Sequence, residues 1–158
     1  MTSPTTMDDR EPDHEASFTA GEYDAMLNVV RTAAALLDQL DGLLRPYGIG
    51  TTQYNVLRIL RIAEPDGFCR NALRDRMLSR MPDMTRLLDR MEEMGLVTRE
   101  RDDEDRRMVT TRITDAGRRL VDELEGPVIE LYQGRFGRLS PDEVGTLTQL
   151  LRRVREGG

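Results

Sequence analysis

Lysine and tryptophan are absent from the 158-residue chain, and cysteine and histidine occur once each. The lone Cys69 cannot form an internal disulfide, and with His14 it is too little for a cysteine–histidine metal site. A Ser–His or Cys–His catalytic pair cannot be built on a histidine in a polar N-terminal segment, and no glycine-rich phosphate loop is present. We therefore expect no metal, no cofactor and no catalytic residues, and the chain is not predicted to be an enzyme.

Long hydrophobic runs are also missing. No apolar stretch approaches the ~18 residues that a membrane span needs, and the N-terminal region is acidic and polar rather than a signal peptide. These features predict a soluble, cytoplasmic protein. Aromatic residues make up only 4% of the chain, which can indicate disorder. The apolar residues are strongly periodic after about residue 18, however, so the remainder is expected to fold.

A net charge of −6 by itself argues against a nucleic-acid partner, but the charge is unevenly distributed. Residues 1–24 carry seven acids and one arginine, which leaves 22 acids and 22 arginines in residues 25–158. The body of the chain is therefore neutral, and local patches decide its partners. One such patch lies between Phe68 and Met91, with six arginines and three acids. All 23 basic residues are arginine, so every phosphate contact must use a guanidinium group.

Apolar periodicity predicts six helices and one β-hairpin. The helices are expected at 19–46, 51 to about 64, 70–78, 82–95, 114–136 and 140 to about 156, and the hairpin strands at 96–102 and 107–113. The segment SPDE, Ser140 to Glu143, is the clearest helix start, because it combines an N-cap serine, a proline and a glutamate at the third position. Thr51 is expected to cap the second helix.

This order predicts a mainly α fold with a small β-hairpin wing. The helices and hairpin within 51–113 form a helix-turn-helix followed by a wing, and the outer helices carry apolar stripes that are wide for a monomer of this size. They most simply bury one another in a homodimer. The predicted organisation is a flexible acidic tail at 1–17, a first dimerisation helix within 18–50, a winged helix-turn-helix lobe at 51–113, and two dimerisation helices within 114–158.

Three motifs resemble the MarR family of transcription regulators: TRLLDRMEEMGLV, the wing pattern DEDRR, and ITDAGRRL after it. The resemblance runs without a gap from about Thr51 to Val121, and it departs from many members at LSRMPD, Leu78 to Asp83. It implies a dimeric winged helix-turn-helix protein that binds inverted-repeat duplex DNA. Many members of the family release DNA when they bind a small aromatic compound.

In a helix-turn-helix, the N-terminal part of the second helix reads base edges in the major groove. The expected DNA-contacting residues here are Arg80, Met81, Asp83, Met84, Thr85 and Arg86. Arginine suits guanine, and Thr85 can reach a phosphate, a base edge or a thymine methyl group. Asp83 either accepts from cytosine or only caps the helix, and capping is the favoured alternative. The role of Arg90 stays open.

The hairpin offers a second set of candidates: Arg99, Arg101, Asp105, Arg106 and Arg107. Arg99 and Arg101 share one face of the first strand, because they are two residues apart. A carboxylate at the tip can hold a neighbouring guanidinium extended for a narrow minor groove. The family resemblance implies that Arg106 enters the groove and that Asp105 supports it. The alternative is a solvated charged turn.

The tyrosines Tyr23, Tyr47 and Tyr54 are candidates for the walls of a ligand pocket, although core packing is favoured for each. Cys69 is expected to be a small buried hydrophobe rather than an oxidant sensor. The predicted function is a homodimeric, sequence-specific DNA-binding regulator, most simply a repressor released by a small aromatic ligand. Two alternatives stay open: a winged-helix DNA-binding protein that responds to no ligand, and a winged helix used only for docking to another protein.

Overall fold

The computed structural model describes residues 20–78, 83–101 and 108–157. The chain divides into two compact units, residues 1–35 and 36–158. Helix α1 (Ala20–Leu44) provides the described part of the first unit and the beginning of the second. None of the helices in these ranges is both long and apolar enough to cross a membrane.

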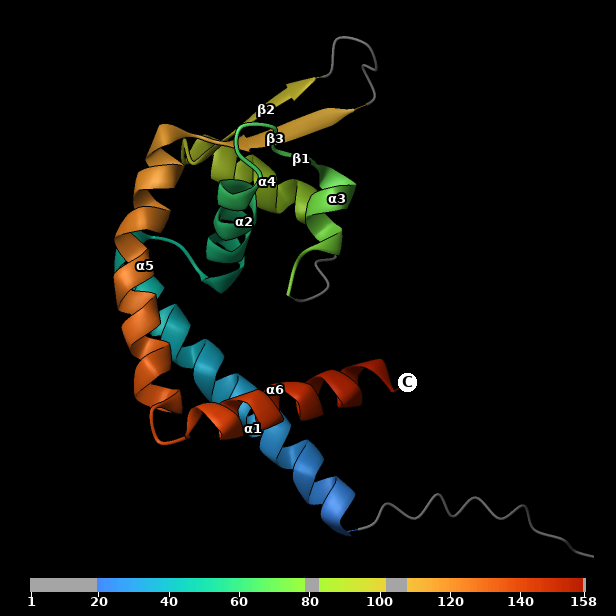
Figure 1. The fold of residues 1–158 in the computed structure, drawn as a ribbon. Helices are drawn as coiled ribbons and strands as arrows, with labels where there is room; N and C mark the ends of the chain where they lie inside the picture. Colours follow the sequence, from blue (N-terminus) through green and yellow to red (C-terminus); the bar gives the residue numbers. More distant parts are fainter. Residues whose placement is uncertain (1–19, 79–82, 102–107, 158) are drawn as a thin grey trace, which may run out of the picture. The chain divides into compact units, whose positions relative to one another are not determined.

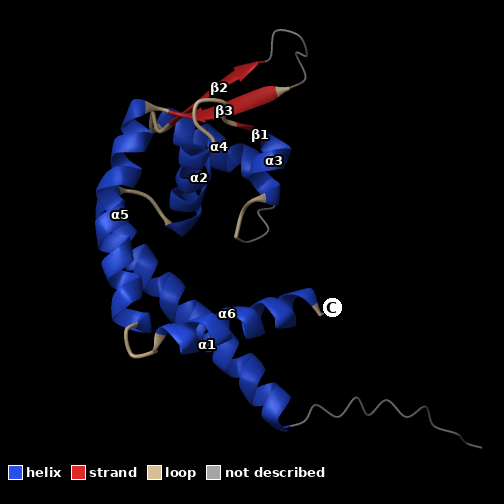
Figure 2. Ribbon diagram, viewed as in Figure 1, coloured by secondary structure: helices blue, strands red, loops and turns tan. Residues whose placement is uncertain are grey.

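The second unit holds the remaining elements, of which Figure 1 labels the α-helices and strands and Figure 2 colours helices and strands by type. They are the short 3-10 helix η1 (Arg45–Tyr47), α2 (Thr51–Ile62), β1 (Phe68–Cys69), α3 (Arg70–Asp75), α4 (Met84–Glu93), β2 (Val97–Arg101), β3 (Val109–Ile113), α5 (Asp115–Phe136) and α6 (Pro141–Glu156). The chain therefore has the predicted fold, which is mainly α with a small β wing.

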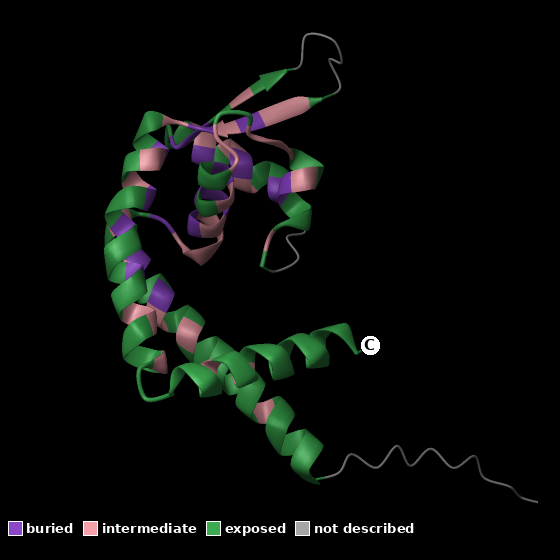
Figure 3. Cartoon of the chain, in the orientation of Figure 1, coloured by how far each residue is buried: buried purple, intermediate pink, exposed green. Residues whose placement is uncertain are grey.

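Helix α2 is central to the hydrophobic core of the second unit. Val56, Leu57 and Leu60 lie on one side of it and are at most 1% exposed, as the apolar spacing predicts. Figure 3 shows buried positions on α2 and the elements around it, whereas α6 has no buried residue. The start of α2 differs from the prediction. Gly50 is the N-cap, and Thr51 instead donates its backbone N–H and its hydroxyl to Asp41 Oδ1, at 2.8 and 2.5 Å.

Helix α4 begins two residues later than predicted, at Met84, and ends close to the predicted stop. Asp83 is its N-cap and accepts from the backbone N–H of Arg86 at 3.1 Å. Gly95 follows the helix with φ 70°, a conformation that glycine adopts without steric cost. The Gly95 and Leu96 amides donate to the carbonyls of Glu92 and Met91, at 2.9 and 3.0 Å. These two bonds form the Schellman turn that returns the chain from α4 into β2.

The wing is a three-stranded antiparallel sheet in the order β1–β3–β2 rather than a hairpin alone. Strands β2 and β3 pair from Val97↔Ile113 to Arg101↔Val109. Strand β1 was missed because two residues are too short to show an alternating pattern. Gly67 precedes β1 with φ 74°, and a Cβ there would lie 2.3 Å from the Thr111 carbonyl oxygen. Only glycine lets β1 approach β3 this closely.

The base of the hairpin is closed by the first turn of α5. Thr114 caps α5 by accepting from the Gly117 amide at 3.0 Å, and its hydroxyl donates to the Gly95 carbonyl at 2.7 Å. Its own amide donates to the Leu96 carbonyl at 3.1 Å. One residue at the end of β3 therefore bonds to the turn that starts β2. At Gly117, a Cβ would lie 2.3 Å from the Leu96 oxygen and 2.9 Å from Ile113 Cγ1.

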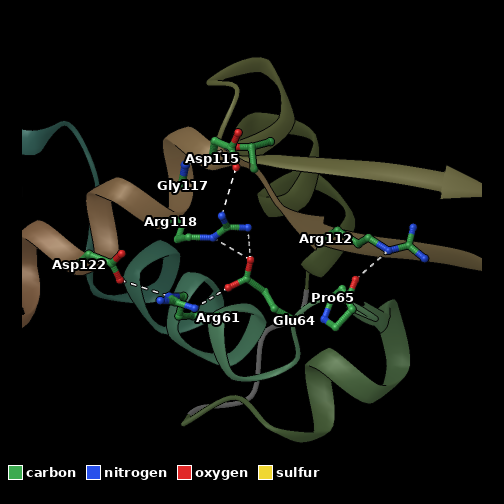
Figure 4. Close-up of polar contacts among 9 residues, drawn as sticks. Arg61, Glu64, Pro65, Arg112, Asp115, Gly117, Arg118 and Asp122 are labelled. Carbon is green, nitrogen blue, oxygen red and sulfur yellow. Dashed lines mark hydrogen bonds and ion pairs between the residues drawn. The ribbon is translucent and has the colours of Figure 1, made fainter.

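A network of ion pairs fastens the loop after α2 to α5 (Figure 4). Glu64 accepts from Arg61 at 2.6 Å and also pairs with Arg118 of α5. Arg61 in turn reaches Asp122, also of α5, at 3.2 Å. Hydrogen bonding from Arg118 and, less strongly, from Arg61 lowers the pKa of Glu64 below its ordinary value of 4.5.

The same loop is tied to the wing. Arg112 of β3 donates to the Pro65 carbonyl at 3.2 Å, and its guanidinium also pairs with Glu100 of β2 at 2.6 Å. The loop after α2 therefore bonds to α5 on one side and to the sheet on the other.

We predict that Gly117→Ala destabilises the fold by ~1–3 kcal/mol, because an added methyl group must displace backbone rather than a flexible side chain. Urea denaturation followed by circular dichroism measures this change. Gly134→Ala is the control. It lies in the same helix with nothing within 4 Å of the added Cβ, and it should stabilise the protein by ~0.5–1 kcal/mol. Equal effects of the two substitutions would contradict the close approach at Gly117.

The Glu64 network makes the thermal stability sensitive to acid. Since folding lowers the pKa of Glu64, its contribution to stability is complete above pH 4.5 and is lost as the pH falls through the folded-state pKa. In Glu64→Gln, the melting temperature should be lower at neutral pH and should fall less steeply on acidification. The exposed acid Glu130 of α5 supplies the control, Glu130→Gln. Melting curves of Glu64→Gln that run parallel to wild type at every pH would refute this assignment.

Candidate nucleic-acid interface

The N-terminal turn of α4 exposes a threonine and an arginine. The side chain of Arg86 is 87% exposed, and Thr85 beside it is also exposed. Asp83 holds Arg86 by an ion pair of 3.4 Å in addition to capping the helix. Met84 is a correction: it is only 4% exposed and belongs to the core, so it cannot reach a base edge. Arg80 and Met81, predicted in the same group, lie outside the described residues.

Helix α3 brings further cations to this turn. Arg70 donates from Nη1 to the Thr85 hydroxyl at 3.2 Å, which connects the first turn of α3 to the first turn of α4. Arg74 and Arg76 of the same segment are exposed, and the Arg76 guanidinium stacks 4.2 Å from the Phe68 ring centre. The prediction did not name Arg70 as a site residue. The only sequence signal for it was its place in the positively charged stretch between Phe68 and Met91.

The two candidate arginines of β2 differ in their exposure. Arg101, at the end of β2, is exposed, as a DNA-contacting group requires. The side chain of Arg99 is only 24% exposed and pairs with Asp89 and Glu92 of α4. Its two carboxylate partners were not predicted. Asp105, Arg106 and Arg107 lie outside the described residues.

Cys69 is a free cysteine and is half-buried rather than buried as predicted. It lines a cavity of about 310 Å³ between α3, α4 and the sheet, together with Thr85, Leu88 and Arg99.

Within the described parts of the chain, no group of three His, Cys, Asp or Glu side chains could hold a metal ion.

The three candidate tyrosines have different surroundings within their own units. Tyr54 is 5% exposed and lines a groove of about 280 Å³ between α2 and α5, with Arg58, Ile62, Val121 and Glu125 among its other walls. Burial raises the pKa of the Tyr54 hydroxyl. Tyr47 packs against the core of the second unit. Tyr23 belongs to the first unit and is 50% exposed.

Known proteins share this architecture. The model of the MarR family matches residues 47–108. The chain is 30% identical over 143 residues to an uncharacterised HTH-type transcriptional regulator of Bacillus subtilis, YkoM, covering 87% of this chain and 91% of that protein.

Two solved structures have the same fold as this chain. Sco3205 of Streptomyces coelicolor, a MarR family regulator solved in complex with DNA, is 26% identical with a TM-score of 0.81, covering 92% of each chain. CouR of Rhodococcus jostii RHA1, solved with p-coumaroyl-CoA, is 25% identical with a TM-score of 0.74, covering 89% of this chain and 98% of that one. The fold, the wing and these matches together show that the chain belongs to the MarR family of transcription regulators.

Proposed function

We propose that this chain is a cytoplasmic, homodimeric regulator that binds specific duplex DNA, and that it represses transcription until a small ligand releases it. One observation carries the proposal. The exposed first turn of α4, with Thr85 and Arg86, lies in the same winged lobe as the exposed Arg101 of β2. A helix N-terminus for the major groove and a hairpin for the backbone or minor groove are the two parts that this mode of DNA binding uses.

The charge of the lobe supports a DNA partner. Residues 68–91 carry six arginines and three acids, although residues 25–158 as a whole are neutral. Arg70, Arg74, Arg76 and Arg86 are all exposed along α3 and the start of α4. Phosphate contacts supply most of the affinity in protein–DNA complexes, so a local excess of guanidinium groups is what such a surface requires. Sco3205, which has the same fold, was solved with DNA.

Within this proposal, the α4 side chains read base edges and the wing fixes the register. Arg86 is the candidate for guanine, whereas Asp83 serves α4 as its cap. At the wing, Arg106 enters the minor groove and Asp105 holds it extended, with Arg101 and Arg107 on the neighbouring phosphates. In a two-fold dimer the two α4 helices enter successive major grooves about 34–36 Å apart, so the operator is an inverted repeat.

Exposed apolar side chains support the dimer. In the second unit, α6 exposes Leu150, Leu151 and Val154, at 50%, 39% and 75%. In the first unit, α1 exposes Tyr23, Met26, Val29 and Val30, at 43–58%. Contiguous apolar faces of this kind mark interaction sites on soluble proteins. A second copy of the chain is the partner that we propose for each set, since a two-fold interface places the same surface of both copies together.

The groove beside Tyr54 is the candidate ligand site in the second unit. Tyr54 offers a hydroxyl group, Ile62 an apolar surface that is 82% exposed, and Arg58 a positive charge. Arg61, Asp122 and Glu125 also line the groove, so its charges are balanced, and the tyrosine and the apolar surface suit a small aromatic compound. CouR, of the same family, was solved with an aromatic acyl-CoA. A ligand that favours a dimer with a different spacing of its two lobes would shift the population away from the state that fits DNA.

The DNA proposal is tested with duplex fragments from upstream of the protein's own gene. Arg86→Ala and Arg106→Ala should each weaken binding by ~1–3 kcal/mol in a gel-shift titration and leave the melting temperature unchanged. Arg119→Ala, which removes an exposed arginine of α5, is the control. Wild-type affinity should fall steeply with salt because counterions are released. No binding at low ionic strength, or a flat salt response, would favour the protein-docking alternative.

The dimer is tested by placing a charge on α6. Leu150→Glu together with Val154→Glu should convert a particle of twice the chain mass into a monomer, because two carboxylates would be buried against an apolar face. Light scattering coupled to gel filtration measures the mass. Gln149→Glu adds the same group at an exposed polar position of α6 and should leave the dimer intact. A wild-type monomer at micromolar concentration would contradict the proposal.

A further inference from the structure

Arg99 of β2 is bound by two carboxylates of α4. Its Nε and Nη2 atoms donate to Glu92 Oε2, at 2.9 and 2.6 Å. The same Nη2 atom lies 2.6 Å from Asp89 Oδ1. The other oxygen of Glu92, Oε1, accepts from the Arg99 backbone amide at 3.2 Å. Glu92 therefore holds both the main chain and the side chain of one residue.

The contacts of Arg99 with Glu92 and Asp89, here called the Arg99 clamp, join two elements of the lobe. Glu92 lies in the last turn of α4, directly before the Schellman turn at Gly95, so the strand that leaves this turn passes beside it. Arg99 is the middle residue of β2, and its partner across the sheet, Thr111, is 1% exposed. The clamp thus joins α4 to the middle of the wing rather than to a free end.

The contrast with the other arginines indicates a different role. Arg86 is 87% exposed, whereas Arg99 is 24% exposed. For Arg99 to contact a phosphate, its guanidinium would have to leave both Asp89 and Glu92. That movement would leave two unpaired carboxylates on the helix that faces the DNA, where like charges repel. The charge of Arg99 is therefore already neutralised by carboxylates of the lobe.

We propose that Arg99 is a positioning residue: through Glu92 and Asp89 it sets the direction of the wing relative to α4, so that hairpin and helix meet the DNA together. This inference rests on the proposed DNA-binding function and replaces the predicted direct contact of Arg99 with DNA. A wing held in its binding direction loses less conformational entropy on docking. Arg99 also neutralises two acids of the recognition helix that would otherwise weaken phosphate binding.

A double-mutant cycle separates positioning from direct contact. Wild type, Glu92→Met, Arg99→Gln and the double variant are titrated against a duplex that the wild type binds. If Arg99 acts through Glu92, each single variant weakens binding by about tenfold, the size expected for a lost charge-assisted bond. The double variant should then be no more than about twofold weaker than either single variant, because both changes break the same interaction.

The control is Glu93→Met, which removes an equal charge from an exposed neighbouring position on α4 without touching Arg99. It should bind as well as wild type or slightly better, since it removes only repulsion. If Arg99 instead contacts DNA directly, Glu92→Met behaves like this control, and Arg99→Gln costs the same factor in both backgrounds. That result would overturn the positioning role.

A second measurement distinguishes positioning from general damage. On a duplex trimmed at both ends to the part that the α4 helices span, the wings have no DNA to contact. There, Glu92→Met should bind within about twofold of wild type. An equal loss on the long and trimmed duplexes would show a damaged lobe and refute the proposal. If wild type binds no duplex at all, the DNA-binding function itself fails. Normal wild-type binding with additive losses in the cycle overturns only the role of Arg99.

Discussion

The close approach of α5 to the turn after α4 is the constraint on which the DNA-binding lobe depends. Gly117 leaves room for the Leu96 carbonyl where any side chain would collide, and Thr114 bonds to both residues of the turn, Gly95 and Leu96. Because β2 begins after this turn and β3 ends at Ile113, directly before Thr114, these contacts hold the start of β2 and the end of β3 together. The placement of the wing relative to α4 follows from that closure and from the Arg99 clamp.

Among the described residues of the lobe, most acids are paired with arginine. Asp83 caps α4 and holds Arg86, while Asp89 and Glu92 hold Arg99. Glu64 joins two arginines of different elements. A chain without lysine has only the planar, multidentate guanidinium for such links, and that group suits carboxylates in fixed geometry. This explains why a surface proposed for a polyanion carries so many carboxylates.

Much of the fold was predictable because helices leave strong local signals. The 3.6-residue apolar period located the helices, and Ser140 with Glu143 marked the start of α6, where the structure has both bonds of the capping box. Capping by Asp83 was favoured from its position alone and is confirmed. Strand β1 could not be predicted, because its pairing depends on Gly67 approaching Thr111, which is far away in the sequence.

The site residues were less predictable than the fold, since exposure depends on tertiary contacts. Met84 is buried because it lies on the same face of α4 as Leu88 and Met91, whereas Thr85 and Arg86 stay exposed. The alternating pattern placed Arg99 and Arg101 on one face of β2, but it could not show that the end of α4 lies under only one of them. The partners of Arg99 could be identified only from the three-dimensional structure.

Arg112 gives the wing a connection that a simple hairpin lacks. Its guanidinium pairs with Glu100 of β2 and donates to the Pro65 carbonyl. Pro65 directly follows Glu64, which pairs with Arg118 of α5. The loop after α2 thus links the strands of the wing to α5 through side-chain bonds. The wing therefore has a second attachment to the long helix, in addition to the direct passage of the chain from β3 into α5.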